Sequence, residues 1–127
     1  MTRPNPAEKR LYPRIDYSLP IKVAANGYDF ATSTQNVSCL GAYCSINKYV
    51  PPFTRVMIKL TLPIKSDAIN KSYSVECNGV VVRSEDAENG AFNIAIFFNQ
   101  INLGQRKKIS RYISQFLPER PATTKRF

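Results

Sequence analysis

The chain has 127 residues, of which 43% are hydrophobic and 21% charged, so it is long enough for one domain with its own core. Its formal net charge of +9 favours polyanionic partners such as nucleic acid or phosphorylated ligands. It has no histidine, so the commonest general base is missing. Its three cysteines form no CxxC pair and are too few for a structural zinc site, which needs four ligands. We therefore predict a binding protein rather than an enzyme, with no metal and no cofactor.

The ends of the chain differ in composition from its middle. We divide it into a leader over residues 1–8, one domain over 9–117 and a polar tail over 118–127. No apolar run approaches the ~20 residues of a membrane span, and the N-terminus lacks the apolar stretch of a signal peptide. These features predict a soluble, cytoplasmic protein with reduced thiols.

Alternating apolar side chains and turn signals predict six short strands in the middle of the chain. We expect these strands at 21–24, from 28 onward, and at 40–46, 55–62, 73–82 and 92–98. Asn26-Gly27 and Asn89-Gly90 predict tight turns before the second and the sixth strand. Two apolar faces are expected to lie in the core: Leu40, Ala42, Cys44 and Ile46 in the third strand, and Val56, Ile58, Leu60 and Leu62 in the fourth. Short strands at close spacing indicate an antiparallel barrel or sandwich.

One helix is predicted over 103–117, where Asn102 can cap the first turn and Gln105 follows three residues later, as in a capping box. An apolar stripe at helical spacing predicts that this helix packs on the barrel: Ile109, Tyr112, Ile113, Phe116 and Leu117. Basic residues lie mostly off that stripe and are more often solvated surface than a binding site: Arg106, Lys107, Lys108 and Arg111.

A basic segment, Lys9-Arg10-Leu11-Tyr12-Pro13-Arg14, precedes the first strand. Pro13 disfavours helix at the preceding residue, so Arg10 and Arg14 can converge only by wrapping around a common object. The planar fork of arginine suits phosphate oxygens and the O6 and N7 acceptors of guanine. Together with Lys9 the two arginines could clamp a guanine nucleotide with two phosphates. The same pattern also occurs in basic leaders that meet surface carboxylates.

A polar segment with a glycine, Asn36-Val37-Ser38-Cys39-Leu40-Gly41, follows the second strand signal. Asn36 and Ser38 are two residues apart, so on a strand they point to the same side and could present donors and acceptors to a base edge. Gly41 would let a ligand approach the backbone closely or would permit a positive φ. The alternative is a polar strand end with a glycine bulge.

In this order and at this separation, the two segments resemble the signature of the PilZ domain family, RxxxR followed by [D/N]xSxxG. The segments 79–83 and 92–98 are similar to later strands of that family, so the resemblance covers roughly residues 8–117. It implies a mainly β fold, a six-stranded antiparallel PilZ-type barrel with one C-terminal α-helix. The chain departs from the family pattern at Asn36, where Asp is more frequent, and at Asn93-Ile94-Ala95, where the family often has Gly.

The resemblance implies a receptor for cyclic di-GMP that changes conformation on binding and regulates a bacterial process such as motility, exopolysaccharide production or biofilm formation through an unidentified protein partner. The basic leader would close over the ligand. The ligand contacts that the resemblance implies are Arg10, Arg14, Asn36, Ser38 and Gly41, with Lys9 and Arg83 as additional contacts. Arg83 could stack on guanine through its guanidinium plane. We expect a monomer or a weak homodimer.

Two other functions are compatible with the sequence. A small basic barrel with seven Tyr and seven Phe could bind nucleic acid, although Phe92 and Phe98 have core-facing parity and no stacking platform is evident. A ligand-blind PilZ-like adaptor would bind only protein, but such members usually lack the arginines that are present here. Nucleic-acid binding and ligand blindness are therefore the less favoured alternatives.

Overall fold

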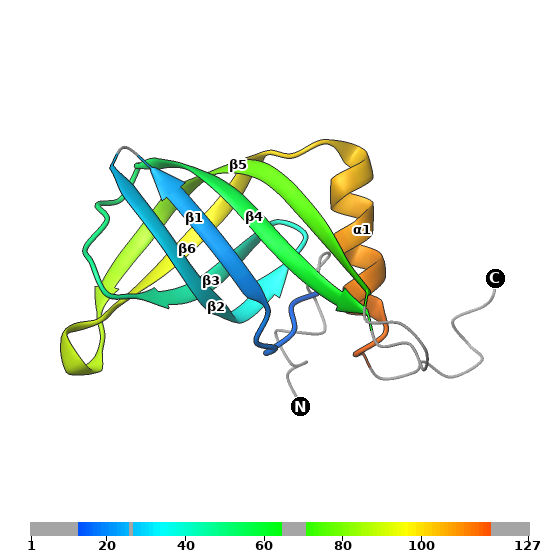
Figure 1. The fold of residues 1–127 in the computed structure, drawn as a ribbon, viewed down its shortest axis with the longest axis horizontal. Helices are drawn as coiled ribbons and strands as arrows, with labels where there is room; N and C mark the ends of the chain where they lie inside the picture. Colours follow the sequence, from blue (N-terminus) through cyan, green and yellow to red (C-terminus); the bar gives the residue numbers. More distant parts are fainter. Residues whose placement is uncertain (1–12, 26, 65–70, 118–127) are drawn as a thin grey trace, which may run out of the picture.

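A computed structural model describes residues 13–25, 27–64 and 71–117, which form a closed barrel with a helix at one end (Figure 1). The strands close in the order β1-β2-β3-β6-β5-β4, and every neighbouring pair is antiparallel. The elements are β1 (Pro20–Ala25), β2 (Tyr28–Ser38), β3 (Gly41–Ile46), β4 (Arg55–Ile64), β5 (Lys71–Asp86), β6 (Phe92–Gln100) and α1 (Leu103–Ser114). The predicted six-stranded antiparallel barrel with one C-terminal helix is confirmed.

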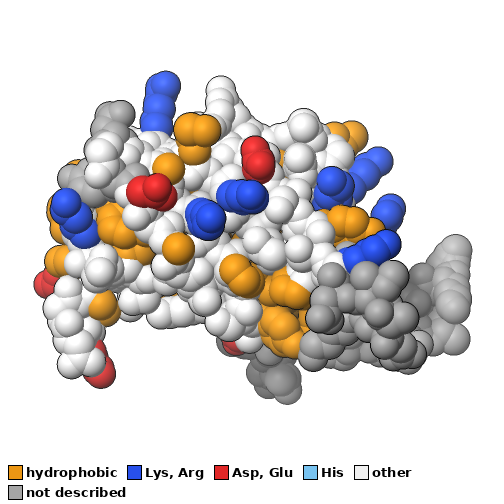
Figure 2. Space-filling view, viewed as in Figure 1, with side chains coloured by type: hydrophobic (Ala, Val, Ile, Leu, Met, Phe, Trp, Pro, Cys, Tyr) orange, Lys and Arg blue, Asp and Glu red, His pale blue; other side chains and the backbone are white. Residues whose placement is uncertain are grey.

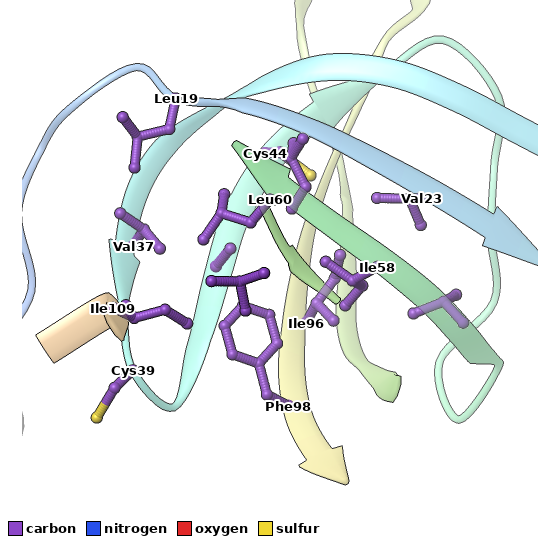
Figure 3. Close-up of a cluster of buried hydrophobic side chains, with 14 of the residues drawn as sticks. Leu19, Val23, Val37, Cys39, Cys44, Ile58, Leu60, Ile96, Phe98 and Ile109 are labelled. Carbon is purple, nitrogen blue, oxygen red and sulfur yellow. The ribbon is translucent and has the colours of Figure 1, made fainter. Parts of the chain in front are cut away.

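The barrel interior is filled by the apolar faces of the strands. Side chains that the alternation placed inward are buried throughout β4, at Val56, Ile58, Leu60 and Leu62. Figure 3 shows how side chains from different strands, among them Leu60 of β4 and Phe98 of β6, meet in the interior. Leu40 is an exception to the predicted third face, because it lies in the turn before β3 and is partly buried against the core.

The turn signals mark real reversals of the chain. Gly27 has a φ of 76°, and Asn89 and Gly90 have φ values of 60° and 75°, which is the left-handed region that these residues tolerate best. Asn26 lies outside the described residues. The fifth strand is longer than predicted, Lys71–Asp86 instead of 73–82. At its C-terminal end, a bulge between Val81 and Arg83 breaks the alternation on which the prediction depends.

The helix closes one end of the barrel. Asn102 caps it as predicted, since its side-chain oxygen accepts a hydrogen bond from the backbone N–H of Gln105 at 2.8 Å. The return bond of a capping box is missing, because Oε1 of Gln105 is buried without a partner among the described residues. Ile109, Tyr112 and Ile113 are buried, and Ile109 points toward the barrel core (Figure 3). The helix ends at Ser114, earlier than predicted, and residues 115–117 continue it as a turn.

Residues 15–19, just before β1, are hydrogen-bonded to β2. Ile15 and Val37 exchange two backbone hydrogen bonds of 3.0 Å, and Ile15 is buried. Farther along, the hydroxyl of Thr34 accepts from the backbone N–H of Leu19 at 2.9 Å and donates to the carbonyl of Tyr17 at 2.6 Å. These contacts fix residues 15 to 19 along β2.

The predicted leader and tail, residues 1–8 and 118–127, lie outside the described residues, as do Lys9 and Arg10. Within the described ranges, no helix combines the length and the apolar character that crossing a bilayer requires. The three cysteines are free thiols, with Cys39 and Cys44 buried and Cys77 partly buried.

Candidate functional site

A groove of about 440 Å³ crosses the outer surface of β2, β3, β6 and β5. Several of its lining residues are the contacts that the sequence motifs predicted: Arg14, Asn36, Ser38, Gly41 and Arg83. These residues come from three separate parts of the chain, and the barrel order brings those parts together. The remaining predicted contacts, Lys9 and Arg10, lie outside the described residues.

The floor of the groove is one row of residues that runs across the four strands. Asn36 on β2 pairs with Tyr43 on β3, Tyr43 pairs with Ala95 on β6, and Ala95 pairs with Arg83 on β5. Cross-strand partners lie within side-chain contact distance of their neighbours. The row therefore sets an amide, a phenol and a guanidinium side by side, with the small Ala95 between the last two.

Two β-bulges turn the ends of this row outward. The pairing shifts by one residue between Thr34 and Asn36 in β2, and again between Val81 and Arg83 in β5. Thr34 and Val81 are buried, so strict alternation would point Asn36 and Arg83 into the core as well. The extra residue in each strand reverses that parity, which is a common way for a sheet to aim a side chain at a site.

Arg14 reaches the groove because its neighbour is anchored. Ile15 is held against Val37 by the two backbone hydrogen bonds described above, and Val37 lies between Asn36 and Ser38 on β2. Arg14 is therefore held next to β2 through the residue that follows it. It lines the groove together with Asn36 and Ser38.

Ser38 and Gly41 close the β2–β3 turn in addition to lining the groove. The Ser38 hydroxyl is nearly buried and accepts a hydrogen bond of 3.0 Å from the backbone N–H of Leu40, which leaves its own O–H as a donor. Gly41 is not among the positive-φ residues of the described chain, so that interpretation of the glycine is wrong. A Cβ at this position would instead overlap the backbone carbonyl oxygen of Ile96 on β6.

Glu85 lies next to the groove and contacts two of its lining residues, Arg83 and Tyr43. Nε of Arg83 lies 3.5 Å from Oε2 of Glu85, and its guanidinium carbon lies 5.8 Å from the centre of the Tyr43 ring. The Tyr43 hydroxyl donates a 2.8 Å hydrogen bond to Oε1 of Glu85. This hydrogen bond to a carboxylate, with some burial, raises the pKa of Tyr43 above its usual value.

Sequence reasoning missed Tyr43 and the apolar wall of the groove. Val82 and Phe97 are about half exposed, at 50% and 44%, and with Leu40 they form the apolar part of the lining. Tyr43 could have been found from its outward parity between Ala42 and Cys44, two residues beyond the motif glycine. Val82 gave no such signal, because its outward position depends on the bulge beside it.

The composition of the groove suits an anion that carries flat rings. Among the described residues that line it are two arginines and no carboxylate. Arginine forks bind phosphate oxygens through paired, charge-assisted hydrogen bonds. Exposed Val82 and Phe97 offer surface for the face of a base, and the Asn36 amide offers both a donor and an acceptor for its edge.

A second, larger groove of about 600 Å³ runs over β1, β4, β5 and β6 but contains none of the predicted contacts. Arg55 is the single charged residue among those described for it, and its other polar groups are amides. The face shown in Figure 2 carries basic and acidic side chains interspersed with apolar ones, and basic residues gather at the end that α1 occupies in Figure 1. On chemical grounds the smaller groove is the better anion site.

Burial changes the acidity of two of the three cysteine thiols. Burial raises the pKa of Cys44 to about 12 and that of Cys77 to about 11, so both thiols are protonated at neutral pH. Within the same ranges no group of three or more Cys, Asp or Glu side chains is arranged to hold a metal ion.

Known proteins resemble the chain in both sequence and fold. The family model of the PilZ domain matches residues 8–115, whereas no curated protein matches the sequence. Nine solved chains match, among them the Bacillus subtilis inhibitor of motility, MotI/DgrA, with a TM-score of 0.72 and 17% identity. The alignment covers 85% of this chain and 51% of the MotI/DgrA chain, so the present chain corresponds to about half of that structure. At this level of identity the likeness shows a common fold.

Proposed function

The chain belongs to the PilZ domain family, and from this we propose that its groove binds cyclic di-GMP and that the protein acts as a receptor for this second messenger. PilZ domains are binding and adaptor domains. One observation supports the proposal most strongly: Arg14, Asn36 with Ser38, and Arg83 come from distant parts of the sequence, yet they line the same groove.

Cyclic di-GMP has the chemistry that this groove would recognise. Its two phosphates would pair with the guanidinium groups of Arg14 and Arg83, and Arg10 and Lys9 are proposed to add to this clamp. Its guanines would meet the Asn36 amide and the Ser38 hydroxyl at their edges. One guanine face could lie against Arg83, which already lies over the Tyr43 ring.

Binding would regulate a partner protein rather than a reaction at the groove. MotI/DgrA is described as an inhibitor of motility, so control of motility is the first process to test for this chain, before exopolysaccharide or biofilm formation. We propose a cytoplasmic adaptor, monomeric or weakly dimeric, whose ligand-bound groove and rim present a surface that the empty protein lacks.

Isothermal titration with cyclic di-GMP tests the proposal directly, with GTP and cyclic di-AMP as controls. Arg14→Ala and Arg83→Ala should each weaken binding by about tenfold to a hundredfold, which corresponds to the ~1.5–3 kcal/mol of a charge-assisted contact. Arg55→Ala, in the second groove, removes the same charge elsewhere and should leave the affinity unchanged. Absence of cyclic di-GMP binding, together with tight and strongly salt-dependent binding of single-stranded RNA, would favour the nucleic-acid alternative.

A further inference from the structure

Glu85 contacts two groove residues without lining the groove itself. Its two carboxylate oxygens are divided between Nε of Arg83, at 3.5 Å, and the hydroxyl of Tyr43, at 2.8 Å. Arg83 and Tyr43 both line the groove, and they belong to β5 and β3, two strands that β6 separates. One carboxylate therefore connects side chains from the two strands that flank β6.

The sheet geometry explains how a single residue reaches both. Glu85 is two residues beyond Arg83 on β5, so both side chains point to the outer face, and its partner on β6 is Asn93. Ala95, the β6 partner of both Arg83 and Tyr43, has a small side chain. The guanidinium and the ring can therefore approach to 5.8 Å above it.

The contacts leave the ligand-binding atoms unoccupied. Glu85 uses Nε of Arg83, which leaves the two terminal nitrogens of the guanidinium for an anion. It uses the hydroxyl of Tyr43, which fixes the ring through its far end rather than covering its face. A carboxylate that competed with the ligand would be expected among the groove-lining residues, and Glu85 is not one of those described.

We propose that Glu85 is a positioning residue that holds Arg83 and Tyr43 in the orientation in which they receive the anionic dinucleotide. This inference rests on the function proposed above and adds to it a residue outside both sequence motifs. The side chains of Arg83 and Glu85 are 61% and 50% exposed, and exposed ion pairs add little to folding stability. The contribution of Glu85 should therefore appear in ligand affinity rather than in the stability of the barrel.

The test is titration of cyclic di-GMP into the full chain and its Glu85 variants. Glu85→Ala should weaken binding about three- to tenfold, the cost of ordering one or two free side chains on binding. Glu85→Gln offers one acceptor oxygen in place of two, so it can keep only one of the two contacts and should bind with an affinity between those of the unmodified chain and Glu85→Ala. Glu76→Ala removes an exposed carboxylate from the same strand, outside this groove, and serves as the control for net charge.

A double-mutant cycle separates positioning from a general electrostatic effect. If Glu85 acts through Arg83, the double variant Arg83→Ala/Glu85→Ala should bind cyclic di-GMP only slightly more weakly than Arg83→Ala alone. The small additional loss of affinity would come from the contact between Glu85 and Tyr43. Unchanged or tighter binding by Glu85→Ala, or full additivity in the cycle, would overturn the inference while leaving the proposed function intact. If the unmodified chain fails to bind cyclic di-GMP, the proposed function falls, and the inference falls with it.

Discussion

At the scale of single residues, Gly41 shows that a binding motif can be required by the fold itself. Its Cα faces the backbone of β6, and a Cβ would overlap the carbonyl oxygen of Ile96, which cannot rotate away. We expect Gly41→Ala to lower the free energy of unfolding by about 1–3 kcal/mol or more, measured by urea denaturation.

Gly104 provides the matched control, since the nearest atom to a Cβ built there, Oδ1 of Asn102, is at 3.4 Å, an ordinary contact distance. Gly104 lies in the first turn of α1, so Gly104→Ala should be neutral or stabilise the protein by up to about 0.5 kcal/mol. Equal stabilities of the two alanine variants would show that β3 and β6 are not packed as closely at Gly41 as described.

The buried thiol of Cys44 predicts a loss of stability at high pH. Burial raises the pKa of Cys44 to about 12, whereas a thiol in the unfolded chain titrates near 9. Between these values the unfolded state loses its proton first, so the folded state binds more protons and the free energy of unfolding falls as the pH rises. The contribution of Cys44 is complete below pH ~9 and declines by up to about 1.4 kcal/mol per pH unit above it.

Cys44→Ala should therefore lose stability more slowly than the unmodified chain between pH 9 and pH 11, as followed by chemical denaturation at each pH. Val23→Ala truncates another fully buried side chain that does not titrate, so it should shift the whole profile without changing its slope. Parallel profiles for all three proteins would show that the Cys44 thiol ionises as readily in the folded state as in the unfolded state.

At the scale of elements, the bulges show what alternation can and cannot predict. Strand β4 and residues 94–98 of β6 have inward faces as predicted, because the period of two holds there, and the register shift of β6 comes only between Phe97 and Gln100. The bulges in β2 and β5 reverse the parity of Asn36 and Arg83, and no residue in either strand marks the extra position. The resemblance to the family identifies both as site residues, Asn36 within a motif and Arg83 as an additional contact, and their outward direction cannot be derived from the local pattern.

The Thr34 hydroxyl binds the segment that follows Arg14 to β2. The hydroxyl pairs with the N–H of Leu19 and the carbonyl of Tyr17, so Thr34→Val would leave a buried backbone N–H without that acceptor. We expect this isosteric change to cost about 1–3 kcal/mol in urea denaturation and to weaken cyclic di-GMP binding as well, because Arg14 loses support. Thr61→Val, on β4, makes the same change at a hydroxyl without a described hydrogen bond and should have little effect; similar losses in both variants would argue against a specific role for Thr34.

Ala95 keeps the centre of the groove floor open. A larger side chain there would stand between the Tyr43 ring and the Arg83 guanidinium. Because this would displace Arg83, a central contact for the ligand, Ala95→Leu should lower the affinity for cyclic di-GMP at least about tenfold in a titration. Because the side chain points outward, the melting temperature should change little. Ala31→Leu, at an exposed position on β2, is the control, and an equal effect of both variants would contradict this role for Ala95.

At the scale of the whole molecule, the barrel was predictable from the sequence and the arrangement within the groove was not. Short alternating runs and turn residues define six strands, and the two motifs identify Arg14, Asn36 and Ser38 as a group. The cluster of Tyr43, Arg83 and Glu85 depends on strand order, because β6 lies between β3 and β5 although it follows both in the chain. Such a pairing has no signature in residue spacing.

The most direct test of the central claim is to locate the bound ligand by two-dimensional amide NMR during a titration with cyclic di-GMP. We predict shifts concentrated at Arg14, Asn36 to Tyr43, Arg83 and Ala95 to Phe97, and small or no shifts around Arg55, Met57 and Gln100 in the second groove. Shifts concentrated in the second groove, or an unchanged spectrum at saturating ligand, would contradict this prediction.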